Sequence, residues 1–374
     1  MSNAKKLESI QILRGIAALS VVMFHFRSFL VPEGTDRSLP DALLGWGAIG
    51  VDLFFVISGF IMYYVTFNKT AGIKTAISFL INRAIRIIPL YYIILLFAFL
   101  TGGAMSTFHY QEKIDNLISA ITFTPHLKEY APLYILESGM YNVRWTLNYE
   151  LYFYFAFAVC LLFRNKLTLL LVWFLSPVII SSYLTSSITL STQGYNFNSV
   201  ALRFITNPII LEFGMGVMAG FIYSKLNKFH IKKSITPPFT AMLLIGVGIY
   251  FKQLTSYNLL SGFAFSILVL TFALYNEQLT HKYTKLLVAL GNISFPLYLI
   301  HNPLMNFIAK KIETPYPNAI HNVSGFLLLI SMSVIVSYFI HKYIETKLSS
   351  ALRHRFNKAW DKEKIEITQA EQAK

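Results

Sequence analysis

An arginine and a histidine, Arg14 and His25, lie inside the first hydrophobic segment of the chain. Charged and titratable side chains are costly within a bilayer, and those that occur there usually serve a function. The two residues are 11 positions apart, which at about 100° per residue returns to nearly the same helix face with a rise of roughly 16 Å. One helix face would carry a fixed cation near one membrane surface and a titratable imidazole deeper inside. This arrangement suits chemistry on a substrate that enters the membrane from the cytoplasmic side.

The composition determines the class of protein that must position these two side chains. Hydrophobic residues make up 55% of the 374 residues and charged residues only 13%, whereas a soluble domain carries about 25% charged residues. The mean hydropathy is +0.53, and the charges cluster between long apolar stretches. We therefore predict an all-α integral membrane protein with a single domain over residues 1–350 and a charged cytoplasmic tail over 351–374. About ten transmembrane helices are predicted, at roughly 9–30, 46–67, 84–104, 145–163, 167–185, 201–224, 237–252, 258–276, 287–309 and 322–345.

The placement of lysine and arginine gives the orientation of these spans. If the N-terminus is cytoplasmic, 23 of the 32 basic residues fall on the cytoplasmic side and the remaining 9 on the outer side. Both termini are then predicted to be cytoplasmic, in a multi-pass protein of the inner (plasma) membrane. The formal net charge of +14 is explained by this bias, so we predict no binding to nucleic acid.

Acidic and histidine side chains gather in the outer half of the predicted bundle, and the set comprises His25, Asp52, Glu150 and His301. A carboxylate beside an imidazole can hold the required tautomer and raise its basicity. Glu150 could therefore orient His25, or it could be a structural partner of Arg144 or Arg203. Asp52 could equally cap or pair at the outer interface, and His301 could be a buried structural histidine.

Two arginines, Arg83 and Arg86, form an Arg-x-x-Arg pair that would share a helix face at the cytoplasmic surface, with Lys69 just before them. They could anchor the topology, or they could bind phosphate, which paired guanidinium groups recognise in a bidentate manner. The sequence contains no Walker loop and no G-x-G-x-x-G pattern. It also has no cysteine and histidine cluster with zinc spacing, so we predict no metal site.

Four stretches in this order resemble the acyltransferase-3 family, whose members are integral-membrane enzymes that mostly O-acylate extracytoplasmic carbohydrates. The resemblance runs from Ile10 to Tyr343, nearly the whole chain. The stretches are Leu13-Arg14-Gly15 followed by Phe24-His25, then 50–60 (GVDLFFVISGF), then 83–91 (RAIRIIPLY) with 145–150 (WTLNYE) downstream, and finally 293–301 (ISFPLYLIH).

The resemblance implies a cytoplasmic acyl-CoA donor, usually acetyl-CoA. It also implies that Arg14 and His25 are the essential pair, that Glu150 belongs to the catalytic centre, and that Arg83 and Arg86 contact the CoA phosphates. Lys69 is a further candidate for binding CoA. The candidates for binding the acceptor are Asp52, Trp145, Tyr298 and His301. Some relatives carry a fused SGNH hydrolase-like domain, and this chain is expected to be of the stand-alone type.

The leading hypothesis is acyl transfer to a hydroxyl of a cell-envelope glycan, such as an exopolysaccharide or lipopolysaccharide, or of a lipid-linked saccharide. His25 would act as general base on that hydroxyl or form a transient acyl-imidazole that relays the group outward. The connection 105–144, the largest outer element, is expected to help select the acceptor. The alternatives are a proton-coupled transporter or exporter that uses the same buried charges and a structural membrane subunit. The acyl chain, the acceptor and the oligomeric state stay open.

Overall fold

The computed structural model of the chain describes residues 6–66, 68–136, 141–229, 234–280 and 284–358. Within these ranges the secondary structure is helical and no strand occurs. Six helical stretches are long and apolar enough to cross a membrane, judged by length and composition. They are Glu8–Leu30, Ser38–Thr66, Ile73–Gly102, Lys166–Thr185, Val200–Leu226 and Val323–Lys358. The chain is therefore an all-helical, multi-pass membrane protein.

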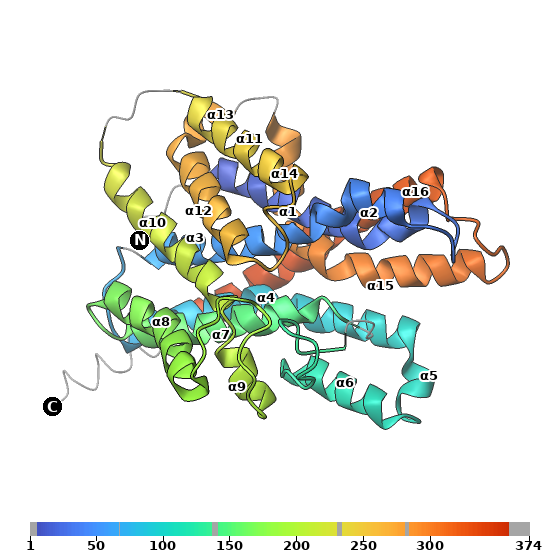
Figure 1. The fold of residues 1–374 in the computed structure, drawn as a ribbon, viewed down its shortest axis with the longest axis horizontal. Coiled ribbons are helices and arrows are strands. Elements are labelled where there is room, and N and C mark those ends of the chain that lie inside the picture. The colour runs from blue at the N-terminus through green and yellow to red at the C-terminus, as the bar shows by residue number, and fades with distance from the viewer. Residues whose placement is uncertain (1–5, 67, 137–140, 230–233, 281–283, 359–374) are drawn as a thin grey trace.

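The helices follow one another with short connections (Figure 1). In chain order they are α1 (Glu8–Phe26), η1 (Arg27–Leu30), α2 (Ser38–Leu44), η2 (Gly45–Ile49), α3 (Gly50–Thr66), α4 (Ile73–Gly102), α5 (Ala104–Thr107), α6 (Gln111–Thr122), α7 (Arg144–Leu161), α8 (Lys166–Thr185), α9 (Val200–Ile205), α10 (Ile210–Leu226), α11 (Thr236–Tyr250), α12 (Leu259–Leu274), α13 (Asn276–Leu279), α14 (Lys285–Asn292), α15 (Ser294–Glu313), α16 (Val323–Phe339) and η4 (Ile340–Glu345).

Each of the ten predicted spans overlaps at least one of these helices. The predicted spans at 237–252 and 258–276 correspond to α11 and α12, which are apolar but only 15 and 16 residues long. Ten membrane crossings and cytoplasmic termini therefore stay predictions. Residue 67 of the second predicted span and residues 359–374 of the predicted tail lie outside the described residues.

Two predicted boundaries differ from the structure. Helix α4 begins at Ile73 and contains 30 residues, whereas the sequence predicted a span beginning at residue 84. The additional turns are stabilised because Ala76 and Phe79, three positions apart on one face, are buried. The predicted span 287–309 is divided into α14 and α15, which are separated at Ile293.

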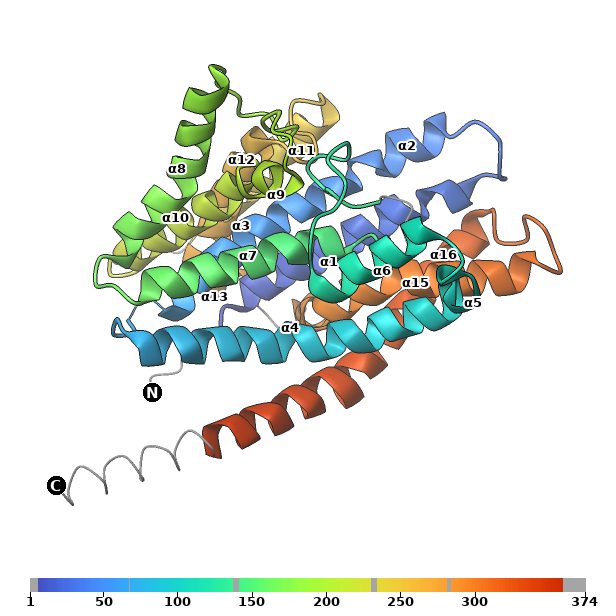
Figure 2. The same ribbon diagram turned by 90° about the horizontal axis from the view of Figure 1, so that it is seen from below.

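Three helices that build the site run in the same direction through the bundle. In Figure 2, α1, α4 and α15 all run from one end of the molecule toward the end that carries α5 and α6. We call the end at which these helices begin the arginine end, because Arg14 and Arg86 lie in the first halves of their helices. The other end is called the opposite end.

Helices α3 and α10 approach each other closely through two glycines. A Cβ atom on Gly59 would lie 2.1 Å from the carbonyl oxygen of Phe213, and one on Gly216 would lie 2.0 Å from the carbonyl oxygen of Val56. Small residues permit this approach in membrane proteins, where close packing replaces the hydrophobic effect between helices. The contact fixes Phe55 of α3 against Phe213 of α10, with ring centroids 4.7 Å apart.

Candidate active site

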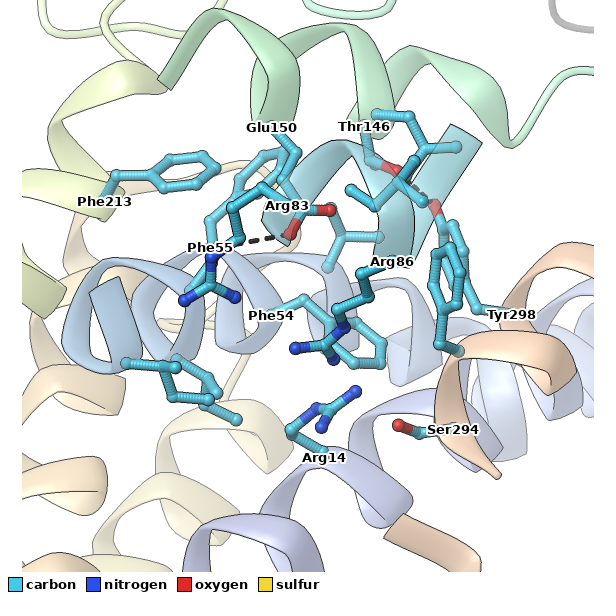
Figure 3. A pocket seen from close by; sticks show the side chains of 17 residues that line it. Arg14, Phe54, Phe55, Arg83, Arg86, Thr146, Glu150, Phe213, Ser294 and Tyr298 are labelled. Atoms are coloured by element: carbon cyan, nitrogen blue, oxygen red, sulfur yellow. Dashed lines mark hydrogen bonds between the residues drawn. The ribbon is translucent and has the colours of Figure 1, made fainter. Parts of the chain in front are cut away.

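Three arginines from two helices point into one cavity (Figure 3). Arg14 comes from α1, and Arg83 and Arg86 come from α4, where they lie inside the helix rather than before it. We call this space the arginine cavity. Its other polar lining residues are Ser58, Thr146, Glu150, Ser294 and Tyr298, and phenylalanines and aliphatic side chains complete it.

Glu150 of α7 is the carboxylate that lines the arginine cavity. Its Oε1 accepts hydrogen bonds from the hydroxyl of Tyr154 and, at 3.4 Å, from the hydroxyl of Ser58.

The alternative partners considered for Glu150 are engaged elsewhere. Arg144 donates to Asn116 Oδ1, Ser119 Oγ and the Tyr141 carbonyl, and Arg203 donates to Asn196 Oδ1 and backbone carbonyls.

The formal charge of the arginine cavity is positive, because three guanidinium groups face a single carboxylate. Lys69 does not line the cavity, but partial burial and then the nearby guanidinium of Arg83 lower the pKa of Lys69. The positive potential therefore extends from the cavity to the arginine end. Such a site favours a ligand with several negative charges.

His25 lies in a second cavity, on the side of the arginine cavity that faces the opposite end. The volume of this histidine cavity is about 120 Å³, and its lining includes Phe24, Asn142, Trp145 and Tyr257. Arg14 and His25 therefore lie on the same helix, as predicted, but they open into different cavities.

A second histidine lies beside His25. The ring centroids of His25 and His301 are 5.1 Å apart, and His301 is fully buried. Nδ1 of His301 lies 3.2 Å from the carbonyl oxygen of Leu297, so a neutral ring that donates there leaves Nε2 as an acceptor. Among the described residues, Nε2 has no hydrogen-bond partner. The structure brings His301, and not Glu150, next to His25.

A thin wall separates the two cavities. Val51 of α3 and Tyr298 of α15 line both of them. The hydroxyl of Tyr298 is 2.8 Å from Thr146 Oγ1 (Figure 3). It also donates at 3.3 Å to the carbonyl of Val143. These bonds hold the phenol ring in place between α15 and α7.

Asp52 lines neither of these cavities. Its carboxylate is fully buried and accepts hydrogen bonds of 3.0 Å from the backbone N–H groups of Tyr257 and Asn258, just before α12. It therefore contacts the backbone of the segment before α12, whose N-cap is Asn258, and its role in binding the acceptor stays a prediction. The hydrogen bond from the backbone N–H of Tyr257 to Asp52 also affects the histidine cavity. It holds Tyr257 against Trp145, with ring centroids 5.2 Å apart.

Several polar residues of the two cavities were not singled out from the sequence. Thr146 and Ser294 lie inside the family-like stretches, so their position was a usable signal. Ser294 is fully buried, lines the arginine cavity, and has a hydroxyl without a hydrogen-bond partner among the described residues. Ser58 also lies inside such a stretch, at 50–60, whereas Asn142 lies outside all of them. In the part of the chain that the structure describes, no three metal-ligating side chains form a group that could hold a metal ion.

Comparison with known proteins extends the resemblance. Residues 7–342 match the acyltransferase domain that defines the acyltransferase-3 family. The chain is 28% identical over 281 residues to the exopolysaccharide production protein ExoZ of Rhizobium meliloti, covering 71% of this chain and 78% of that protein. It is 22% identical over 378 residues to the peptidoglycan O-acetyltransferase OatA of Listeria monocytogenes, covering 92% of this chain and 56% of that protein. No solved structure gives a significant match. Because the matched domain spans nearly the whole chain, the protein belongs to the acyltransferase-3 family.

Proposed function

We propose that this membrane acyltransferase moves an acetyl group from cytoplasmic acetyl-CoA to a hydroxyl of an extracytoplasmic or lipid-linked glycan, in the inner membrane. One observation carries the proposal. An arginine cavity and a histidine cavity meet at Val51 and Tyr298, so an anionic donor and a hydroxylic acceptor can approach one point from opposite ends. The names of the two relatives support a glycan as acceptor and acetyl as the acyl group.

The arginine cavity is proposed to bind the donor. CoA carries phosphates at one end and the thioester at the other, so its charged end suits Arg14, Arg83 and Arg86. Lys69, nearer the arginine end, would add to the attraction at the entrance. Glu150 would keep the guanidinium groups from repelling one another and would help to orient them. The pantetheine arm would then lie along the apolar lining toward Tyr298.

The histidine cavity is proposed to bind the acceptor, with Trp145 and Tyr257 against a sugar ring. In direct transfer, His25 takes the proton of the acceptor hydroxyl while the oxygen of that hydroxyl attacks the thioester carbonyl. The C–S bond breaks, the ester forms, and the CoA thiolate recovers the proton. In the relay, a ring nitrogen of His25 attacks the thioester, the C–S bond breaks, and CoA leaves as the thiol with the ring proton. The acceptor hydroxyl then attacks the acyl-imidazole, the C–N bond breaks, the ester forms, and the hydroxyl proton goes to the ring nitrogen, which regenerates His25.

His301 is proposed to be a positioning residue for His25. A free Nε2 beside the His25 ring can accept its N–H and so fix which nitrogen of His25 faces the acceptor. The role resembles that of the residue that orients the base in other acyl-transfer sites. His301 would thus orient His25, a role for which Glu150 was one candidate from the sequence. We propose that Glu150 contributes to donor binding instead.

Acetyl-CoA turnover by purified protein in nanodiscs tests the proposal, with wild type compared with His25→Ala and the thermal stability of both measured. We expect wild type to release CoA and the folded variant to lose this activity. If wild type never turns over acetyl-CoA or another acyl-CoA, and instead moves a solute across the membrane of a liposome, the enzyme proposal is overturned in favour of a transporter. Trapping of a labelled acetyl group on His25 without acceptor would favour the relay.

A further inference from the structure

A third cavity opens at the opposite end of the bundle, between α4, α5, α6 and α15. Its volume is about 360 Å³, within the range of roughly 300–1,000 Å³ that is typical of small-molecule sites. Two lysines, Lys113 and Lys310, line it, and we call it the lysine cavity. It shares no lining residue with the arginine or the histidine cavity.

A line of polar side chains on α15 connects the wall between the first two cavities with the lysine cavity. Tyr298, Asn302, Asn306 and Lys310 are spaced four residues apart and so neighbour one another along the helix. Tyr298 lines the histidine cavity, and Asn306 and Lys310 line the lysine cavity. Between them, Asn302 Nδ2 donates at 2.8 Å to Oδ1 of Asn142, which also lines the histidine cavity. The Oδ1 atom of Asn302 is buried without a partner among the described residues. Polar groups are costly in a membrane helix, so a continuous row of them indicates a path for a polar ligand.

A buried cation lies directly behind the lysine cavity. Arg144 has no exposed surface and forms no ion pair in the described part of the chain. Its Nη2 donates at 2.6 Å to Oδ1 of Asn116, a residue of the cavity lining. This bond fixes the orientation of the Asn116 amide and leaves its Nδ2 as the donor for a ligand. An unpaired buried guanidinium and two lysines, against one carboxylate from Glu112, make the cavity electropositive.

The lining is chemically suited to a sugar. It combines hydroxyls (Thr101 and Thr107), amides (Asn116 and Asn306) and the ring of Phe307, which offer hydrogen bonds to hydroxyl groups and an apolar surface for a ring face. Glu112 can accept hydrogen bonds from sugar hydroxyls, and its single negative charge is outweighed by Lys113 and Lys310. Lys113 already donates to Ser106 Oγ at 2.9 Å, whereas the ammonium group of Lys310 has no partner among the described residues and is available for an anion.

We propose that the lysine cavity is a second saccharide subsite that binds an acidic sugar residue of the acceptor, away from the hydroxyl that is acylated, with Lys310 pairing with its carboxylate. The inference rests on the proposed function and adds the acceptor class to it. An acceptor bound at both cavities would lie along the polar row of α15. Its acidic residue would then determine which hydroxyl reaches His25.

The test uses labelled acetyl-CoA, full-length protein in nanodiscs, and the membrane saccharides of source cells that lack the gene. Half of the saccharide is chemically reduced at its carboxyl groups, which removes the carboxylate and leaves any phosphate. We expect wild type to acetylate the untreated saccharide with a KM about tenfold lower than that for the reduced saccharide, the size of effect that a charge-assisted hydrogen bond gives. Lys310→Gln should raise the KM for the untreated saccharide to the value measured for the chemically reduced saccharide. Lys310→Arg should restore the preference for the untreated saccharide.

Lys252 supplies the matched control, because it is an exposed lysine that lines none of the three cavities. Lys252→Gln should retain the wild-type preference. Asn306→Ala should raise the KM for both saccharides, since its amide contact does not depend on the carboxylate. Equal KM values for both saccharides with wild type, or a preference that persists in folded Lys310→Gln, would overturn the inference while leaving the proposed function intact. If wild type transfers no label to either saccharide, the proposed function itself fails.

Discussion

The imidazole rings of His25 and His301 lie side by side, with their centroids 5.1 Å apart, although the residues are on different helices. Nδ1 of His301 faces the Leu297 carbonyl, so its Nε2 is the nitrogen that can accept from His25. Because the contact joins α1 to α15, it can fix the orientation of the His25 ring relative to α15.

We therefore expect His301→Ala to lower kcat for acetyl transfer by roughly 10- to 100-fold, a part of the 10²- to 10⁴-fold that a positioned general base contributes. The KM for acetyl-CoA should change little, because His301 does not line the arginine cavity. Steady-state kinetics in nanodiscs measures both. His301→Gln offers a carbonyl oxygen as acceptor and should recover part of kcat. A folded His301→Ala variant with wild-type kcat would exclude the positioning role.

The arginine cavity makes a prediction about the donor. Replacing Arg83 or Arg86 with glutamine removes a charge-assisted contact and should raise the KM for acetyl-CoA by about 10- to 100-fold. If the contact is with the 3′-phosphate of CoA, the variant should no longer distinguish acetyl-CoA from acetyl-dephospho-CoA. Arg164, an exposed arginine outside the cavity, is the control, and Arg164→Gln should leave both KM values unchanged. Unchanged KM values in both cavity variants would leave the arginines with a purely topological role.

The sequence predicted the helix that carries Arg14 and His25 better than it predicted the surroundings of these two residues. The spacing of Arg14 and His25 placed both on one helix, as the structure shows. It could not show that they open into two cavities, because the division is made by Tyr298, which arrives from α15. Local periodicity describes one helix, whereas a cavity wall depends on which neighbour packs against it.

Two further features of the site could not be predicted from the sequence, because they also depend on how distant segments pack. Whether Glu150 faces His25 or the arginines depends on the rotation of α7 against α1 and α4, and depth along the membrane does not determine it. The partners of Asp52 are the side chain of Glu212 and two backbone N–H groups, all at least 160 positions later in the chain, so no local pattern could identify them. The start of α4 was missed because its first turns are amphipathic, and hydropathy detects only the apolar part that follows.

The buried carboxylate of Asp52 makes a prediction about stability. Asp52→Ala leaves the N–H groups of Tyr257 and Asn258 without their acceptor, which should cost roughly 2–6 kcal/mol, since each unsatisfied buried group costs about 1–3 kcal/mol. Thermal unfolding in detergent should show a clearly lower midpoint than in wild type. Glu129→Ala, which removes an exposed carboxylate, should leave the midpoint unchanged. Equal midpoints for Asp52→Ala and wild type would mean that the two N–H groups find other partners.

The wall between the arginine and histidine cavities makes the last prediction. Tyr298 touches both spaces and is held by Thr146 and the Val143 carbonyl, so it separates the proposed donor from water on the acceptor side. Tyr298→Ala should join the cavities and admit water to the thioester. We expect the ratio of free acetate to acetylated saccharide to rise several-fold in a product assay with labelled acetyl-CoA.

Tyr298→Phe separates the effect of the ring from that of its hydroxyl. The ring still fills the wall, so the product ratio should stay close to that of wild type, while the lost hydrogen bonds lower stability by about 1 kcal/mol. Thr146→Val removes one of the same bonds from the other side and should resemble Tyr298→Phe in both measurements. If folded Tyr298→Ala keeps the wild-type product ratio, the wall does not control water, and the thioester must be shielded by the bound donor itself. A rise in acetate with Tyr298→Phe as large as that with Tyr298→Ala would instead assign the control of water to the hydroxyl and its bond to Thr146.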